Sequence, residues 1–321
     1  MLRRNFFSTL AAGAAFSQWS RAQQQPGRGA GMPFLERAAE GQPHKGKVLL
    51  ALQAHSDDIP LSAAGTVAKL IDEGYTGYLV RATNDDMGDE DGLGTLGTIG
   101  ENVIGNERDT DGVSKALGCV RHFDLNYNNH RMGDISLNEL IGRLIFLIRL
   151  LQVNTVVCWD PWAHDEENPD HYTLAKGVEA ACWMAGRHHD FPEHFAAGLK
   201  PITVREKYYY ARRPEITRIV DISKQIDKKV EANRSNVAKG PAGHLGSRLR
   251  ADLAKRGQKL PLLGEDDVTA DRNYIKEFVM ARSRALGQQY GVEYAEAFHY
   301  IGPPGPGRVD SYVKEHAVPM R

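Results

Sequence analysis

Hydrophobic and polar residues follow one another along the chain in blocks of two kinds. Short apolar runs have the length of buried strands, and they lie at 47–54, 77–83, 122–125 and 155–159. Longer blocks have apolar residues at helical spacing, and they lie at 61–73, 101–117 and 137–151. Strands that alternate with helices pair in parallel through right-handed crossovers. The pattern therefore predicts an α/β, Rossmann-like fold in which a mostly parallel sheet is layered between helices.

The chain beyond residue 192 is less regular, and we expect an elaborated C-terminal region there. Its predicted elements are a strand at 205–212 and helices at about 223–238 and 271–290. No shift in composition separates a second domain in this part of the sequence. We therefore expect the chain to form one elaborated unit.

The first 22 residues have the pattern of an export signal. The pair Arg3-Arg4 precedes a weakly apolar stretch at 8–16, and the segment S-R-A, with small residues at 20 and 22, follows it. The paired arginines predict a signal of the twin-arginine type, and hence an exported protein of the bacterial periplasm. An ordinary secretory signal or an amphipathic tail would be the alternatives. We expect residues 23–46 to form a linker or N-terminal extension.

Composition and charge narrow the range of functions. The 321 residues are 41% hydrophobic and 25% charged, as in soluble globular proteins. Lys and Arg number 40 against 41 Asp and Glu, so the basic excess that nucleic-acid binding requires is missing. No uninterrupted apolar segment reaches the roughly 18 residues of a membrane span. We therefore expect a small-molecule partner, with no nucleic acid and no stable membrane span; the oligomeric state is not predicted.

Ionisable residues directly follow two of the predicted strands. His55, Asp57 and Asp58 come after the run at 47–54, and His171 comes after the run at 155–159. Ligands of parallel sheets bind where the strands end, so these side chains are expected at one edge. His55, Asp58 and His171 are the donor types that hold catalytic zinc with one position open for water. Asp57 would then be free to accept a proton as a general base.

Helix capping is the alternative interpretation of the two aspartates. Asp57 and Asp58 precede the helix expected at 61–73, and aspartate is favoured at helix N-termini. The second cluster of His and Asp residues after another buried strand favours the metal site over this alternative.

Several segments together resemble the LmbE-like (PIG-L) family of metal-dependent de-N-acetylases, and the likeness extends over residues 47–302. It implies one deacetylase domain over these residues and a C-terminal tail at 303–321. The segments are A-H-S-D-D-I at 54–59, A-G-T-V-A-K-L at 64–70, T-N-D-D-M-G at 83–88, N-P-D-H at 168–171, D-I-S at 221–223 and A-E-A-F at 295–298. The family's usual forms of three of them are A-H-P-D-D, T-x-G-E-x-G and H-P-D-H. The resemblance implies a hydrolase that removes an N-acetyl group from an amino sugar or a related amide.

The resemblance also implies roles for individual residues. His55, Asp58 and His171 match the family's metal ligands, and Asp57 matches its general base. The implied cofactor is Zn²⁺, with Fe²⁺ as an alternative, and the implied nucleophile is water on that metal. Candidate substrate-binding residues follow the strands at the same edge of the sheet, and they are Asp86, His130, Arg131 and Trp162. The alternatives are a hydrogen-bonded turn for His130 and Arg131 and buried packing beside the strand for Trp162.

Three departures from the family pattern bear on activity. Ser56 replaces a proline, and Asn168 replaces a histidine that helps protonate or stabilise the tetrahedral intermediate. An amide donates a hydrogen bond to an oxyanion but is no acid at neutral pH, so His164 is a further candidate for the proton role. Asn233 replaces the histidine of an H-x-S-Q motif. A non-catalytic carbohydrate-binding protein that retains the metal site is therefore the alternative function.

A glycine pattern gives a third hypothesis of a different class. Residues 92–97 read G-L-G-T-L-G, which matches the dinucleotide-binding pattern G-x-G-x-x-G. The segment follows an acidic loop and not a strand, so it lacks the structural context of a nucleotide site. We favour a mobile substrate-gating loop as the interpretation of this segment, and a flexible surface loop is the alternative.

Overall fold

The computed structural model describes residues 32–88, 98–210, 214–239, 242–303 and 308–319. The expected export signal at 1–22 and the glycine pattern at 92–97 lie outside these ranges. Residues from Phe34 onward belong to one compact unit. Within the described ranges, no helix combines the length and the apolar character needed to cross a bilayer.

The unit is built on a sheet in which the described residues contribute eight strands. In spatial order these are β1 (Phe34–Glu36), β7 (Arg218–Asp221), β8 (Ala295–Ile301), β6 (Glu206–Tyr210), β5 (Thr155–Trp159), β2 (Val48–Gln53), β3 (Thr76–Thr83) and β4 (Arg121–Tyr127). Neighbouring strands pair in parallel except at β8, which is antiparallel to both β6 and β7. The prediction of a mostly parallel sheet is confirmed.

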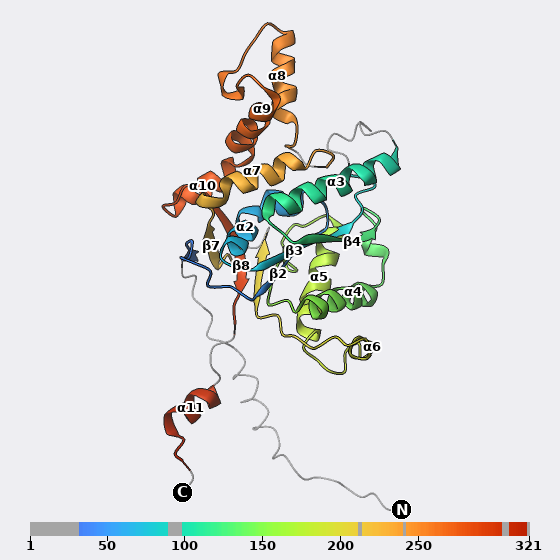
Figure 1. Cartoon of the computed structure of the whole chain (residues 1–321), viewed down its shortest axis with the longest axis vertical. Helices are drawn as coiled ribbons and strands as arrows, with labels where there is room; N and C mark the ends of the chain where they lie inside the picture. The colour runs from blue at the N-terminus through green and yellow to red at the C-terminus, as the bar shows by residue number, and fades with distance from the viewer. Residues whose placement is uncertain (1–31, 89–97, 211–213, 240–241, 304–307, 320–321) are drawn as a thin grey trace, which may run out of the picture. The chain divides into compact units, whose positions relative to one another are not determined.

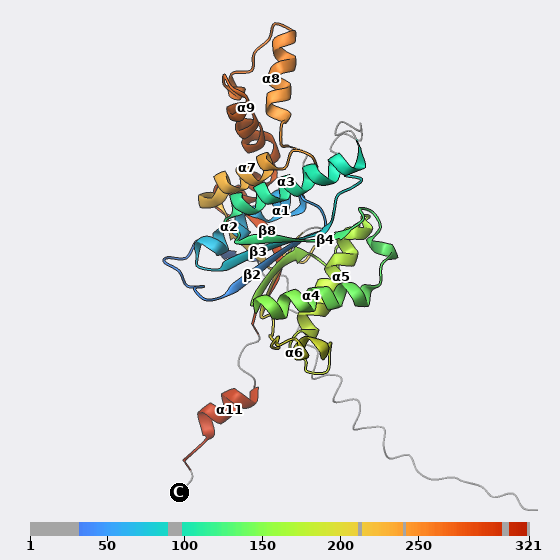
Figure 2. The ribbon, with the colours of Figure 1, turned by 45° about the vertical axis from the view of Figure 1, so that its right-hand side comes forward.

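Helices cover both faces of this sheet. Figures 1 and 2 show α2, α3 and α7 on one face and α4 and α5 on the other. The helices of the described residues are α1 (Asp58–Ser62), α2 (Ala64–Asp72), α3 (Ile99–Leu117), α4 (Leu137–Leu151), α5 (Pro169–Met184), α6 (Glu193–Ala196), α7 (Ile226–Ser235), α8 (Leu245–Lys255), α9 (Asp267–Tyr274), α10 (Ala281–Gln289) and α11 (Arg308–His316). The central strands β2 and β5 are almost wholly buried between the two layers, as their continuous apolar runs predict.

The helix expected at 61–73 differs from the structure in one respect. It begins at Asp58 and is interrupted at Ala63, whose φ of −142° is not helical, so it forms the two helices α1 and α2. The N-terminus of α2 is satisfied from far along the chain, because the Glu296 carboxylate accepts the N–H groups of Gly65 and Thr66. A contact over this sequence separation has no local signal.

Three strands were absent from the sequence-based expectation. β1 is formed by Phe34–Glu36, inside the segment expected to be a linker, and it pairs with β7. β1 and β7 have only three and four residues, too few for a periodic pattern. β8 has mixed polarity along A-E-A-F-H-Y-I and is stabilised by its pairing with β6 and β7.

The strand order determines which loops meet. β5, β2, β3 and β4 are successive neighbours and run in parallel, so their carboxyl ends lie along one edge. The segments that follow these four strands include residues 160–168, 54–57, 84–88 and 128–131, respectively. All the candidate site residues of the sequence analysis belong to these segments or to the first turns of α1 and α5.

Candidate metal centre and catalytic site

Three side chains from two distant segments converge at the carboxyl edge of the sheet. His55 Nδ1 lies 3.0 Å from His171 Nε2 and 3.7 Å from Asp58 Oδ1, and His171 Nε2 lies 3.3 Å from the same Asp58 oxygen. A tetrahedral Zn²⁺ with bonds of about 2.0–2.1 Å keeps its ligand atoms about 3.3 Å apart. Both the donor types and their spacing therefore fit a divalent cation, as the sequence predicted.

The loop after β2 is shaped by one of these ligands. Asp58 Oδ2 accepts the N–H groups of Ala54 and His55 at 2.8 and 3.0 Å. This pairing turns the chain around the carboxylate and leaves Oδ1 facing the two imidazoles. His171 reaches the same point from the first turn of α5, a helix that starts with Pro169 and is capped by Asn168.

Two further carboxylates orient the histidines from behind. Asp170 Oδ2 lies 3.0 Å from His55 Nε2, and Glu166 Oε1 lies 3.0 Å from His171 Nδ1. Each imidazole thus directs one nitrogen to a carboxylate and the other to the metal position, the usual arrangement around protein-bound zinc. The Trp159 ring stacks on His171 with 3.9 Å between centroids, so it packs the ligand in place.

The charges of the cluster favour a cation at its centre. Burial lowers the pKa of His55, but hydrogen bonds to Asp170 and Asp58 outweigh burial and raise this pKa to about 10. Burial opposes ionisation of Asp58 as well, yet His171 and His55 hold the pKa of Asp58 well below its ordinary value. The carboxylates thus favour a proton between the facing nitrogens of His55 and His171, which lie 3.0 Å apart, and a metal ion would displace this proton on binding.

Asp57 is adjacent to this cluster but outside its hydrogen bonds. It is half-buried at the start of α1, where its side chain makes no capping hydrogen bond, so the capping interpretation of Asp57 is wrong. Burial and the negative charge of Asp58 raise the pKa of Asp57 to about 6. A carboxylate of this pKa beside a metal position has the property of a general base near neutral pH.

The remaining catalytic candidates lie in the loop and helix after β5. Asn168 is half-buried, and its Oδ1 accepts the N–H of Asp170 at 3.0 Å as the N-cap of α5. Its Nδ2 is therefore the atom with which it would donate to a substrate. His164 is exposed in the loop before the helix.

Three of the four candidate substrate-binding residues surround one cavity. A cavity of about 490 Å³ is lined by Asp86, Met87 and residues 128–131, which include His130 and Arg131. His130 connects this cavity to the metal cluster. Its backbone N–H donates to Asp170, and its ring centroid lies 6.3 Å from that of His55.

The individual contacts of these residues differ in kind. The Asp86 oxygens accept hydrogen bonds from Nδ2 of Asn128 and from the backbone N–H of Asn129. This carboxylate therefore shapes the turn that lines the cavity. Trp162 is 63% exposed, outside the cavity lining, and its indole N–H donates to Glu179. Arg131 is exposed and lies 3.7 Å from Asp134.

Sequence reasoning missed the orienting carboxylates. Asp170 stands within N-P-D-H beside a predicted ligand, so the motif offered a signal for it. Glu166 lies five residues before His171 in an acidic loop, where nothing local separates it from its neighbours. Asn233, which replaces a family histidine, is buried on α7, and its amide donates to the carbonyls of Pro60 and Lys229.

Together these features define the class: an α/β protein with a candidate His-Asp-His metal centre at the carboxyl edge of its sheet. Residues 50–182, from β2 to α5, match the PIG-L family, described as GlcNAc-PI de-N-acetylase. The chain therefore carries a PIG-L family domain, and all three candidate ligands lie inside it.

Relatives agree with this assignment. The chain is 27% identical over 200 residues to diacetylchitobiose deacetylase from Thermococcus kodakarensis, which covers 61% of this chain and 71% of the relative. The structure of N,N'-diacetylchitobiose deacetylase from Pyrococcus horikoshii matches with a TM-score of 0.61 at 21% identity, over 85% of this chain and 87% of that one.

A hydratase has the same fold. The 4-carboxy-2-hydroxymuconate hydratase from Pseudomonas putida matches with a TM-score of 0.57 at 17% identity, over 82% of this chain and 99% of that one. At such identities a structural likeness establishes the fold alone. The reaction must therefore be argued from the site.

Proposed function

We propose that this protein is a zinc-dependent N-deacetylase, a hydrolase of linear amide C–N bonds that acts on an N-acetylated amino sugar or a related amide. The observation that carries the proposal is the triangle of His55, Asp58 and His171 beside the unbound carboxylate of Asp57. Its position inside a PIG-L domain and the deacetylase names of the relatives support it. The two-histidine, one-carboxylate donor set also suits Fe²⁺, which is the alternative metal.

The proposed mechanism divides the work between the metal and the protein. A divalent cation held by the three ligands would supply Lewis acidity, which polarises a carbonyl and lowers the pKa of water. Asp57 takes the proton of the attacking water and returns it to the leaving nitrogen. The Asn168 amide or His164 donates a hydrogen bond to the developing negative oxygen.

The cavity beside His130 is the proposed substrate site. Asp86, His130 and Arg131 bring polar groups to its wall, which suits the hydroxyl groups of a sugar. Trp162 is proposed to stack on a further sugar unit from outside the cavity. Substitution of His130 by alanine would then raise KM more than it lowers kcat.

Acetate release tests the proposed function directly. Protein loaded with Zn²⁺ should release acetate from N-acetylglucosamine or diacetylchitobiose, and Asp57→Asn should bind zinc but release acetate about 10²–10⁴-fold more slowly. If wild-type protein binds these sugars and releases no acetate, the non-catalytic carbohydrate-binding alternative is favoured. The amide at Asn168, where the family pattern has an acid, is the feature that motivates this alternative.

We also propose export through a twin-arginine signal at residues 1–22, which the Arg3-Arg4 pair supports. A reporter that is active only after twin-arginine export should become active when fused to these residues. The double substitution R3K/R4K should abolish that activity, and equal activity of both fusions would contradict the proposal.

A further inference from the structure

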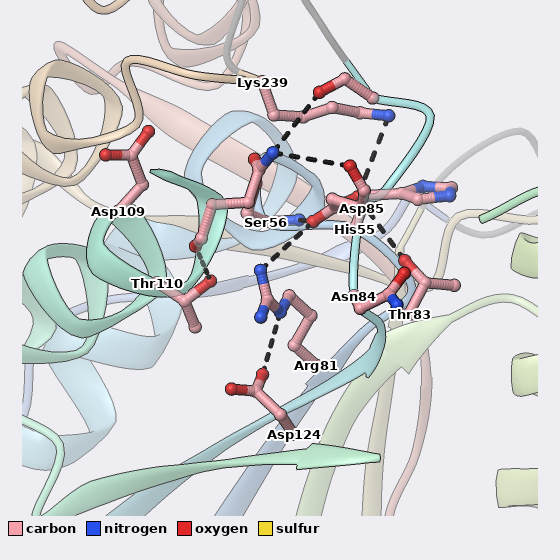
Figure 3. A network of polar contacts seen from close by, with 12 residues as sticks. His55, Ser56, Arg81, Thr83, Asn84, Asp85, Asp109, Thr110, Asp124 and Lys239 are labelled. Atoms are coloured by element: carbon pink, nitrogen blue, oxygen red, sulfur yellow. Dashed lines mark hydrogen bonds and ion pairs between the residues drawn. The ribbon is translucent and has the colours of Figure 1, made fainter. Parts of the chain in front are cut away.

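We infer that Asp85 is a positioning residue for the loop that carries His55, Asp57 and Asp58. The inference rests on the proposed function, because this loop supplies the base and two of the metal ligands. Asp85 follows β3, is fully buried and has a left-handed backbone with φ of 55°. Figure 3 shows its carboxylate between the loop and two cationic side chains.

The contact with the loop is a backbone hydrogen bond. The N–H of Ser56 donates to Asp85 Oδ2 at 3.0 Å. The preceding N–H groups, those of Ala54 and His55, donate instead to Asp58. The carboxylates of Asp58 and Asp85 therefore accept three successive N–H groups of the loop. Of these two carboxylates, Asp58 is a candidate metal ligand and Asp85 is not.

Two cations on the other side balance the charge of Asp85. Arg81 Nη1 lies 3.5 Å from Oδ2, and Lys239 Nζ lies 3.8 Å from Oδ1 (Figure 3). Arg81 is anchored by a second bond from Nε to Asp124 at 2.8 Å. The Thr83 hydroxyl oxygen lies 3.4 Å from Asp85 Oδ1, but its proton has a nearer acceptor in the Ala54 carbonyl at 2.9 Å. The Asp85 oxygens therefore have partners from β3 in Arg81, from the β2 loop in Ser56 and from the segment after α7 in Lys239.

The position of Lys239 is itself constrained. Asp109 on α3 accepts the N–H groups of Val237 and Ala238, which fixes the backbone just before Lys239. Gly88 leaves room for the amine, because a Cβ at that position would lie 2.7 Å from Lys239 Nζ. The chain thus builds a dedicated set of contacts around Asp85.

The sequence pairs these contacts with two departures from the family pattern. In T-N-D-D-M-G, Asp85 stands where T-x-G-E-x-G has glycine, and Ser56 stands where A-H-P-D-D has proline. Proline has no N–H to donate and glycine has no carboxylate to accept one. The hydrogen bond therefore requires both departures together, and it supplies a restraint where proline would restrict the backbone directly.

Variants at Asp85 separate the carboxylate from the backbone. Gly and Asn both tolerate a positive φ, so Asp85→Gly removes the acceptor without backbone strain and Asp85→Asn keeps an oxygen for Ser56. We expect Asp85→Gly to weaken Zn²⁺ binding by about 10–100-fold, as loss of outer contacts does at metal sites. Its kcat should fall while KM stays unchanged, and Asp85→Asn should recover most of the loss.

Variants at Ser56 test the hydrogen bond from its other end. Ser56→Ala keeps the N–H and should bind Zn²⁺ like wild type, whereas Ser56→Pro should weaken binding as Asp85→Gly does. In the Asp85→Gly background, Ser56→Pro should have little further effect, because the acceptor is already gone. An equal effect of Ser56→Pro in both backgrounds would overturn the inference, as would unchanged zinc affinity in Asp85→Gly.

Hydrogen exchange at residues 54–58 provides a readout that needs neither metal nor turnover. Metal-free Asp85→Gly should exchange these amides faster than wild type, and metal-free Asp85→Asn should not. If wild-type protein binds zinc but deacetylates nothing, the proposed reaction fails and the inference on Asp85 still stands or falls by zinc affinity. If Asp85→Gly does not fold, the comparison of Ser56→Pro with Ser56→Ala decides the matter.

Discussion

Two clusters of buried charge in this molecule are built on opposite principles. Around Glu296 on β8 every partner is favourable: Lys229 Nζ donates to it at 2.6 Å, and Gly65 and Thr66 donate their N–H groups. At the metal position Asp57 and Asp58 are adjacent like charges, and the Asp57 carboxylate accepts no hydrogen bond from the residues that the structure describes.

The comparison indicates that the Glu296 cluster stabilises the fold, whereas the cluster at the metal position has the charge arrangement of a catalytic site. The Glu296 cluster joins β8, α7 and α2, and its charges are balanced within the chain. Two neighbouring carboxylates in a buried site cost stability unless a cation joins them. Such an unbalanced pair is typical of catalytic sites, where pKa values are shifted for function.

Loss of a ligand is expected to have the largest effect. His171→Ala should lose most of its zinc and reduce acetate release to background, because the cluster keeps only two donors. The matched control is His189→Ala, which removes an exposed histidine and should change neither quantity. Bound metal is measured by elemental analysis after dialysis, and stoichiometric zinc in His171→Ala would refute the assigned ligand.

Loss of the base should be nearly as severe but of another kind. Asp57→Asn should lower kcat by about 10²–10⁴-fold, the usual contribution of general acid–base catalysis. Its zinc content should remain that of wild type, since Asp57 is no ligand. Steady-state kinetics on the preferred substrate with measured metal content checks both points, and loss of zinc together with activity would assign Asp57 to the ligands.

The balanced cluster should respond in stability. Lys229→Met leaves Glu296 buried without its cation and should lower the free energy of unfolding by about 3–5 kcal/mol. The matched control is Lys255→Met, which breaks the exposed pair with Asp252 and should cost less than about 0.5 kcal/mol. Urea unfolding measures both, and Lys229→Met combined with Glu296→Gln should recover part of the loss. Equal effects of the two lysine variants would remove the distinction between the clusters.

A smaller effect concerns stability and pH at Asp57. Its pKa is raised to about 6 in the fold, so its ionisation destabilises the folded state above that pH. In metal-free protein at pH 8, Asp57→Asn should therefore unfold with a free energy about 1–3 kcal/mol larger than wild type. The difference should shrink as the pH falls through 6 and vanish near the ordinary aspartate pKa. A difference that grows towards low pH would contradict the assigned direction.

Local sequence patterns predicted most of the fold and the candidate metal ligands of the site. Leu137–Leu151 and Thr155–Trp159 have the predicted bounds because their apolar positions repeat at one period throughout. His55, Asp58 and His171 were predicted together because parallel strands must end at a common edge. Asp57 followed from its place beside a ligand in that motif.

What remained unpredicted depends on contacts between distant segments. The division of α1 from α2 accompanies the capping of α2 by Glu296, about 230 residues away, and β7 and β8 hold each other in the sheet. Asp85 acts through a hydrogen bond to the loop after β2, which no periodicity records. Glu166 contacts His171 only five residues further along the chain, but its acidic loop has no periodic pattern that marks it. Their roles emerge only when the loops are assembled.

Anomalous diffraction at the zinc edge from crystals grown with Zn²⁺ tests the central claim most directly. The account predicts one peak per chain at the cluster, within about 2.0–2.2 Å of His55 Nδ1, His171 Nε2 and Asp58 Oδ1. Asp57 should lie beside the peak without bonding to it. A peak at other side chains, or one in which Asp57 replaces Asp58 as ligand, would contradict the account.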